Sequence, residues 1–242
     1  MSLKVPILLP SVWLFNISFM SPNAPPDDSE RVNGAFYERI CPATWPILHR
    51  ELTPLPNLQL SASTPCIAEL VVLLAIDYPS PLSSEVLSRL ILSGGRPPTS
   101  HVNCYFLLGS VIAAIGGLGR LWCFRALGRH FTHQLALRKD HELITTGPYA
   151  IVRHPGYLFG QLSALGMSLM IGNPGSFMRR CGWLGTTVGQ VVVGVWAMQV
   201  VLGWVLSLAR CRSEDTLLRE RFGEGWDGYS QSVRYRMIPG LY

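Results

Sequence analysis

Charged side chains are scarce in this chain of 242 residues: Asp, Glu, Lys and Arg make up 14% of it, against 48% hydrophobic residues. Soluble domains carry roughly 25% charged residues, so the deficit argues against a soluble protein. The mean hydropathy of +0.27 points the same way. The net charge of +5 does not indicate nucleic-acid binding, because the basic residues flank apolar segments instead of forming one basic face.

Paired cysteines are also lacking. The six cysteines are scattered, with no Cys-x-x-Cys pair and no metal-ligand spacing, which argues against a disulfide framework or a zinc site. His133 and His141 fit no ligand pattern either. We therefore expect reduced thiols and no metal.

Long hydrophobic runs are present, at residues 5–20, 66–78, 101–124, 157–172 and 183–208. A membrane-spanning helix needs about 20 apolar residues, so the runs predict an all-α, polytopic integral membrane bundle of about five transmembrane helices. The first run also resembles a short signal peptide after Lys4. We favour a retained helix, because a multi-span protein needs no cleavable signal.

The composition changes along the chain. Residues 21–65 are rich in Pro, Asp, Asn and Ser and predict a loop, with one interfacial helix around residues 34–40. We divide the chain into 1–100, with N-terminal membrane helices and this loop, and 101–242, a more regular membrane core.

Two polar blocks stand out, at residues 138–157 and 214–229. Arginines and lysines gather around both blocks, whereas the segment 173–182 between them carries only Arg179 and Arg180. The positive-inside rule places both blocks on the cytosolic side. Two predicted spans separate the blocks, so the chain crosses and returns, and the blocks can form one site.

The first block combines a turn with polar side chains. Gly147-Pro148 predicts the turn, and Pro155 excludes a regular helix through His154. Tyr149, Arg153, His154 and Tyr157 would then lie at the start of the next helix, where unpaired N–H groups suit a carboxylate or phosphate. The alternative is that these side chains form a belt at the membrane interface and bind no ligand. We favour a binding site, because so many polar and aromatic side chains are concentrated in one short segment.

The second block has helical spacing up to Phe222-Gly223, where we expect the helix to end. Arg210 and Glu214 lie at i, i+4 on one face. We interpret Asp215, Glu220 and Arg221 as ordinary surface ion-pairing residues, and Trp226 and Tyr229 as aromatic anchors at the membrane surface.

The two blocks together carry a family resemblance. HELITTGPYAIVRHPGY followed by RCRSEDTLLRERFGEGWDGY resembles the isoprenylcysteine carboxyl methyltransferase family, over roughly residue 106 to the C-terminus. The resemblance implies a protein-S-isoprenylcysteine O-methyltransferase, which transfers a methyl group from S-adenosylmethionine to the C-terminal carboxylate of a prenylated cysteine. The core 101–242 would then be a membrane methyltransferase with a cytosolic cofactor pocket formed by one loop and the tail.

The resemblance also implies roles for individual residues. Arg153 and Arg210 resemble the arginines that bind the substrate carboxylate. The residues implied to line the cofactor site are Gln134, His141, Glu142, Leu143, Ile144, Tyr149, His154, Pro155, Gly156, Tyr157 and Glu214. Animal members place an arginine where this chain has Ser232, and Arg234 is the nearby substitute whose role is left open.

The same resemblance implies a multi-pass protein of the endoplasmic reticulum membrane. Its partners would be the lipid bilayer and the prenylated C-terminal cysteine of small GTPases or lipopeptide pheromones, with no nucleic acid. Three alternatives remain: a phospholipid N-methyltransferase, an NADPH-dependent sterol-type reductase, and a non-catalytic membrane scaffold.

Overall fold

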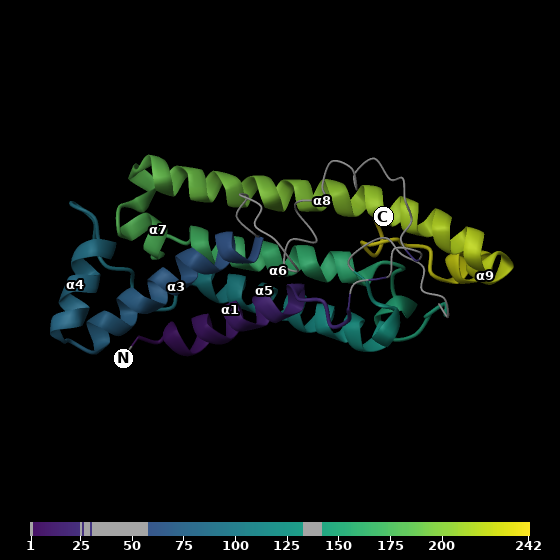
Figure 1. The fold of residues 1–242 in the computed structure, drawn as a ribbon, viewed down its shortest axis with the longest axis horizontal. Helices are drawn as coiled ribbons and strands as arrows, with labels where there is room; N and C mark the ends of the chain where they lie inside the picture. Colours follow the sequence, from purple (N-terminus) through teal and green to yellow (C-terminus); the bar gives the residue numbers. More distant parts are fainter. Residues whose placement is uncertain (1, 25, 27–29, 31–57, 133–141) are drawn as a thin grey trace. The chain divides into compact units, whose positions relative to one another are not determined.

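The computed structural model describes residues 2–24, 26, 30, 58–132 and 142–242, and every regular element in these ranges is a helix (Figure 1). The predicted all-α class is confirmed. The elements are α1 (Val5–Phe19), α3 (Leu58–Asp77), α4 (Pro81–Leu90), α5 (Cys104–Leu127), η1 (Gly128–His130), η2 (Gly147–Ala150), α6 (Pro155–Gly172), α7 (Phe177–Arg180), η3 (Trp183–Gly185), α8 (Thr187–Phe222) and α9 (Glu224–Ser232).

Within the described ranges, three segments are long and apolar enough to cross a membrane: Gln59–Asp77, Cys104–His130 and Thr187–Phe222. They confirm a polytopic helical membrane protein. α1 is a shorter apolar helix of 15 residues, about 22 Å long at 1.5 Å per residue, and α6 has 18 residues. The membrane crossing of α1 and α6 stays a prediction.

The third of these segments, α8, is one continuous helix of 36 residues. The sequence predicted a span at 183–208 followed by a separate polar block, but the helix runs through both until Gly223, whose φ of +53° favours glycine. Little of its apolar part is buried, and Val191, Val201 and Val205 are each more than half exposed. Such a surface suits hydrocarbon and not water.

The structure of the N-terminal half differs from the sequence-based prediction in two places. The predicted loop 21–65 is wrong at its end, because α3 begins at Leu58 and contains Pro65. A proline is tolerated within a membrane helix when neighbouring groups satisfy the freed backbone. α4 was not predicted; its capping box joins Ser80 and Ser83. The interfacial helix expected at 34–40 lies outside the described residues.

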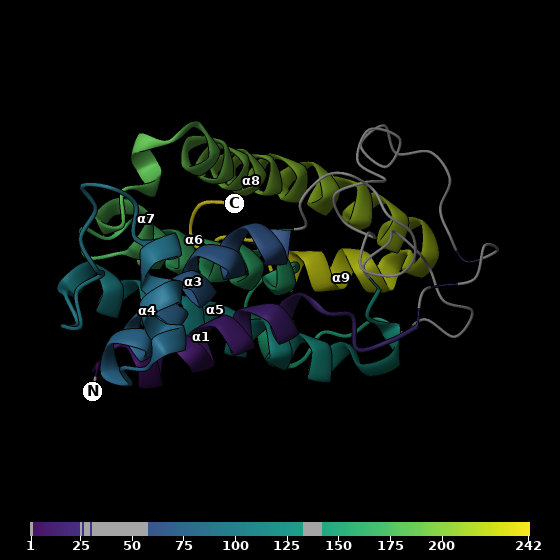
Figure 2. The ribbon, with the colours of Figure 1, turned by 60° about the vertical axis from the view of Figure 1, so that its left-hand side comes forward.

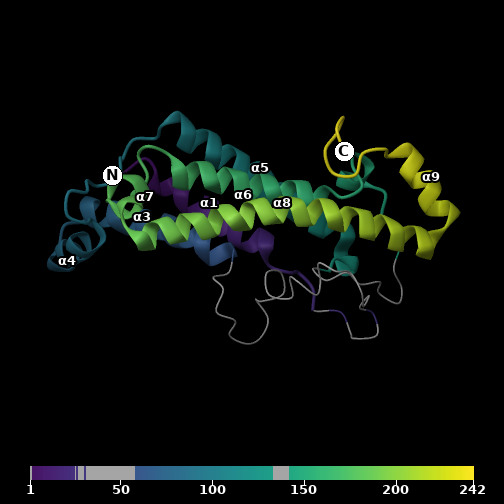
Figure 3. The same cartoon turned by 90° about the horizontal axis from the view of Figure 1, so that it is seen from above.

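The described residues form two compact units, within 1–17, 58–117 and 162–200 for unit 1, and within 18–57, 118–161 and 201–242 for unit 2. Each unit is made of three segments that are separated in the sequence. The division of the chain into 1–100 and 101–242 stays a prediction. In unit 1, α4 packs against α3 (Figure 2). In unit 2, the chain reverses direction after α8 and enters α9 (Figure 3).

A buried ion pair joins several segments of unit 1. Lys4 Nζ lies 2.7 Å from Glu69 Oε1, with the lysine side chain fully buried. Lys4 also donates to the carbonyl of Gly175 and lies 5.0 Å from the centre of the Phe106 ring. The second oxygen of Glu69 accepts the N–H of Phe177. The Lys4–Glu69 pair therefore connects α3 to the residue just before α1 and to the beginning of α7.

We expect Lys4→Met to lower the free energy of unfolding by about 3 kcal/mol, because it leaves a buried carboxylate without its counter-charge. The double variant Lys4→Met/Glu69→Gln should recover part of that loss. Arg89→Met is the matched control, because Arg89 and Glu85 form an exposed pair on α4 of the kind that contributes about 0–1 kcal/mol. Thermal unfolding in detergent measures all three, and equal effects of Lys4→Met and Arg89→Met would contradict the prediction.

Candidate functional site

From Gly147 onward, the first polar block folds as the turn chemistry of its sequence predicts. Gly147 adopts a positive φ of +62° and starts the short helix η2. Pro155 occupies the first position of α6, where proline has no N–H to leave unpaired. Arg153 and His154 therefore lie in the connection immediately before a helix N-terminus, as expected.

The tail holds this connection by its backbone. The N–H of Arg153 donates to the carbonyl of Tyr235 at 3.0 Å, and the N–H of His154 donates to the carbonyl of Arg236 at 2.7 Å. Two adjacent backbone hydrogen bonds fix the direction of both side chains. The first polar block is thus attached to a segment about 80 residues further along the chain.

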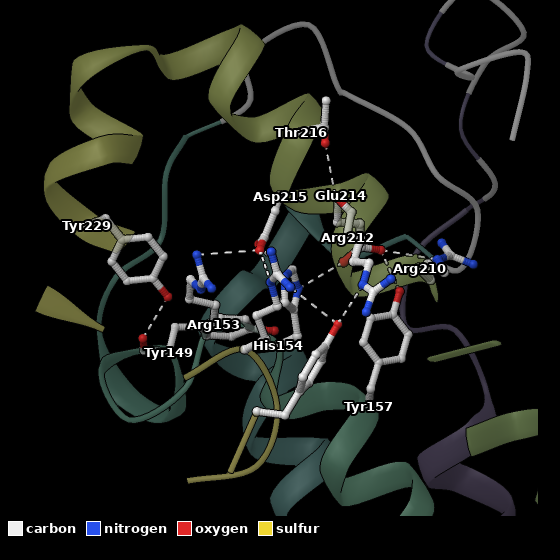
Figure 4. Close-up of polar contacts among 12 residues, drawn as sticks. Tyr149, Arg153, His154, Tyr157, Arg210, Arg212, Glu214, Asp215, Thr216 and Tyr229 are labelled. Atoms are coloured by element: carbon white, nitrogen blue, oxygen red, sulfur yellow. Dashed lines mark hydrogen bonds and ion pairs between the residues drawn. The ribbon is translucent and has the colours of Figure 1, made fainter. Parts of the chain in front are cut away.

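The His154 ring lies between two consecutive carboxylates of α8 (Figure 4). Its Nε2 is 2.7 Å from Asp215 Oδ1, and its Nδ1 is 3.2 Å from Glu214 Oε2. The imidazole side chain is only 4% exposed. Because an imidazolium has two N–H donors, only the protonated ring can donate to both carboxylates at once.

Burial by itself would lower the pKa of the His154 imidazole. The hydrogen bonds to Asp215 and Glu214 outweigh burial and raise this pKa above the ordinary value of 6.5. The site therefore favours a positively charged His154 near neutral pH, and not the neutral ring that a general base requires.

Three arginines surround the two carboxylates. Arg210 Nε lies 3.1 Å from Glu214 Oε1, Arg236 Nε lies 2.8 Å from Asp215 Oδ2, and Arg153 Nη1 lies 3.4 Å from the same Asp215 oxygen. Three guanidinium groups against two carboxylates leave an excess of positive charge, even without a charge on His154. Such a cluster favours an anionic ligand.

Arg153 keeps one donor unused. Its Nε is buried and has no hydrogen-bond partner among the described residues, although Nη2 approaches the carbonyl of Arg234 at 3.5 Å. An unpaired buried donor costs free energy, and a guanidinium binds a carboxylate through two parallel N–H groups. Arg153 is therefore suited to accept a carboxylate from a ligand.

An aromatic wall closes one side of the cluster. Trp226, Tyr229 and Val233 form a buried group, and the Arg153 guanidinium lies 5.9 Å from the centre of the Trp226 ring. The hydroxyl of Tyr229 donates to the carbonyl of Tyr149 at 2.7 Å (Figure 4). The prediction that Trp226 and Tyr229 anchor at the membrane surface is wrong, because α9 turns both rings inward.

The structure brings together most of the residues singled out in the sequence. Tyr157 donates its hydroxyl to Glu214, which already pairs with Arg210 and His154. Pro155 is fully buried, and the carbonyl of Gly156 accepts a hydrogen bond from Arg120.

The other predicted lining residues do not take part in the ion pairs of the cluster. Leu143 packs against the Trp226 group, and Ile144 is half-buried. Glu142 is exposed and lies 3.9 Å from Arg129, so it does not join the cluster. Gln134 and His141 lie outside the described residues.

The sequence did not identify Asp215 or Arg236 as members of this site. Asp215 was predicted to be an ordinary surface residue, but it is 8% exposed and contacts His154, Arg153 and Arg236. Its position directly after Glu214 was the available signal. Arg236 contributes its side chain, whereas Arg234 contributes a carbonyl and leaves its side chain exposed.

Comparison with known proteins yields related sequences. A family model described as the isoprenylcysteine carboxyl methyltransferase (ICMT) family matches residues 107–180. A probable protein-S-isoprenylcysteine O-methyltransferase of Oryza sativa subsp. indica is 31% identical over 164 residues, 67% of this chain and 76% of the relative. The protein-S-isoprenylcysteine O-methyltransferase of Schizosaccharomyces pombe is 28% identical over 61% of each chain.

A further relative carries a different name. The nickel-cobalt-cadmium resistance protein NccN of Alcaligenes xylosoxydans xylosoxydans is 32% identical over 180 residues, covering 65% of this chain and 68% of the relative.

The raised pKa of His154 predicts a pH dependence of stability. A group whose pKa rises on folding contributes stability that is complete below the unfolded value of 6.5 and is lost as pH rises through the folded value. We expect the unfolding temperature to fall over that interval. His154→Gln and Asp215→Asn should both reduce this dependence, because each removes the charged hydrogen bond.

Asp227→Asn is the control, since Asp227 pairs with Arg219 at an exposed site on α9 and should leave the pH dependence unchanged. Unfolding temperatures measured in detergent across this pH range test the expectation. A His154→Gln profile parallel to that of the wild type would contradict it.

Proposed function

Because the chain belongs to the isoprenylcysteine carboxyl methyltransferase family, we propose that it methylates the C-terminal carboxylate of prenylated cysteine with S-adenosylmethionine as the methyl donor. The family membership confirms the resemblance noted in the two polar blocks. It also supports the enzyme class, a membrane-embedded protein-S-isoprenylcysteine O-methyltransferase.

The observation that carries the proposal is the joining of the two blocks in one charged cluster. His154 and Tyr157 from the first block contact Glu214 of the second block. Arg153 contacts Asp215, and Arg210, which lies one helical turn before the second block, contacts Glu214. A belt of unrelated interfacial residues would not concentrate three arginines around two adjacent carboxylates, one of them buried. The arrangement supports binding of a charged ligand at this place.

The chemistry requires little from the protein. An α-carboxyl group has a pKa of about 3.5, so the nucleophile is already ionised at neutral pH and needs no general base. S-adenosylmethionine, when bound, supplies a methyl group activated by a sulfonium. The chain must hold the carboxylate, exclude water and orient the reacting groups.

We assign these tasks to residues of the cluster. Arg153 binds the substrate carboxylate through its unused Nε–H, assisted by Arg210. Glu214 offers a carboxylate to the ammonium group of the donor, and Tyr149 and Tyr157 offer aromatic faces to its sulfonium. His154, held as an imidazolium between two carboxylates, keeps Glu214 in place and does not remove a proton.

The substrate reaches this site from the membrane. The prenyl chain dissolves in the bilayer beside the apolar helices, so the carboxylate is presented at the membrane edge. We propose the endoplasmic reticulum membrane as the location, with prenylated small GTPases or lipopeptide pheromones as protein substrates. The family relationship supports this setting.

The proposal predicts a methyl-transfer activity. Membranes containing the protein, given labelled S-adenosylmethionine and N-acetyl-S-farnesylcysteine, should form a base-labile methyl ester that control membranes do not form. Phosphatidylethanolamine is offered in a parallel reaction. Labelled phospholipid without labelled ester would replace the proposal with phospholipid N-methylation, and no labelled product of either kind would overturn it.

The proposed roles predict different kinetic effects of two variants. Arg153→Lys should raise KM for N-acetyl-S-farnesylcysteine and lower kcat/KM by about 10- to 100-fold, the effect of losing one charge-assisted bidentate contact. Glu214→Gln should instead raise KM for the methyl donor. Arg89→Lys, at the exposed pair on α4, is the control and should leave both values unchanged. Equal effects on both substrates from each variant would contradict the assignment.

A further inference from the structure

Arg120 is an unusual residue for its place in the chain. It lies in α5, within the apolar segment Cys104–His130 that is able to cross a membrane, and it is only 3% exposed. A buried charge in such a segment is expensive and marks a functional position by default. Among the residues that the structure describes, no carboxylate forms a salt bridge with it.

Backbone carbonyls and aromatic rings satisfy this guanidinium instead. Nε donates to the carbonyl of Ser18 at 2.6 Å, and Nη1 donates to the carbonyl of Gly156 at 2.7 Å. The rings of Phe19 and Phe124 lie 4.8 and 5.4 Å from the guanidinium carbon, within the range of a cation–π interaction. All four partners and Arg120 belong to unit 2.

The two carbonyls come from the ends of two other helices. Ser18 lies in the last turn of α1, where carbonyls lack partners within the helix and a positive charge is favourable. Gly156 lies in the first turn of α6, between Pro155 and Tyr157. One side chain therefore connects the end of α1 to the beginning of α6, at the residue next to a member of the charged cluster.

Gly160 provides the space for this contact. A Cβ at residue 160 would lie 2.8 Å from Nη1 of Arg120, closer than a real contact allows. The absence of a side chain one turn after Gly156 lets the guanidinium reach the Gly156 carbonyl. The sequence thus provides both the donor and the gap it needs.

We infer that Arg120 is a positioning residue for the methyl-transfer site: it fixes the first turn of α6 against the end of α1, so that Tyr157 and His154 are held toward Glu214. This inference rests on the proposed function. It extends the site to α1, because Ser18 and Phe19 lie outside the segment 107–180 that matches the family model. Arg120 itself does not touch either substrate.

Three variants test the inference in different ways. Arg120→Met keeps an unbranched apolar side chain and removes both hydrogen bonds, and Arg120→Lys keeps the charge without the planar pair of donors. Gly160→Ala keeps Arg120 and displaces its guanidinium, while alanine itself favours the helix over glycine. Gly194→Ala in α8 is the matched control, because a Cβ there meets no atom within 4 Å.

We expect Arg120→Met and Gly160→Ala to lower kcat/KM by about tenfold or more, the value of one lost charge-assisted hydrogen bond, chiefly through KM for S-adenosylmethionine. Arg120→Lys should recover part of the loss, and Gly194→Ala should match the wild type. Hydrogen–deuterium exchange should increase at residues 153–160 in Arg120→Met and in Gly160→Ala.

Several outcomes would overturn the inference. If Arg120→Met and Gly160→Ala leave kcat/KM and exchange at 153–160 unchanged, or lower thermal stability without changing kinetics, Arg120 is not a positioning residue. If Arg120→Met does not fold, Gly160→Ala decides, since it keeps every polar group. If the wild type itself transfers no methyl group, the proposed function fails, and exchange at 153–160 alone decides whether Arg120 orders this turn.

Discussion

The contact of His154 with Glu214 and Asp215 is the interaction on which the site depends. It joins a connection before α6 to the C-terminal part of α8 through one buried ring. Without His154, the negative charges of Glu214 and Asp215 would repel each other in a site that is partly shielded from water, and this repulsion would destabilise the fold. With it, each carboxylate also takes an arginine, and the positive excess that remains is available to an anionic ligand.

Backbone hydrogen bonds from the C-terminal tail orient His154 for its contact with the two carboxylates. Hydrogen bonds from the N–H groups of Arg153 and His154 to the carbonyls of Tyr235 and Arg236 orient the two side chains, and Arg236 returns its own side chain to Asp215. A carboxylate nucleophile needs orientation more than proton transfer. A rigid, fully bonded connection is therefore the kind of support that the proposed reaction requires.

Local rules predicted the parts of this site that depend on local conformation. Pro155 had to begin a helix, Gly147 had to turn, and Gly223 had to end α8, because proline and glycine restrict or extend the allowed backbone angles. The role of Asp215 could not be predicted in this way, because helical spacing shows which face a residue shares but not what covers that face. Trp226 and Tyr229 were misplaced for the same reason: α9 reverses the chain and buries them.

The sequence by itself determined the membrane class, the helical architecture, the two polar blocks and their family resemblance, since apolar length, turn residues and motif spacing are properties of contiguous segments. Apart from the i, i+4 pair of Arg210 and Glu214, tertiary structure decided which charges meet. The pairing of Lys4 with Glu69, of Asp215 with Arg236 and of Arg120 with the carbonyls of Ser18 and Gly156 joins residues 21 to 102 positions apart. Such contacts depend on how helices pack, and packing is set by side chains from the whole unit at once.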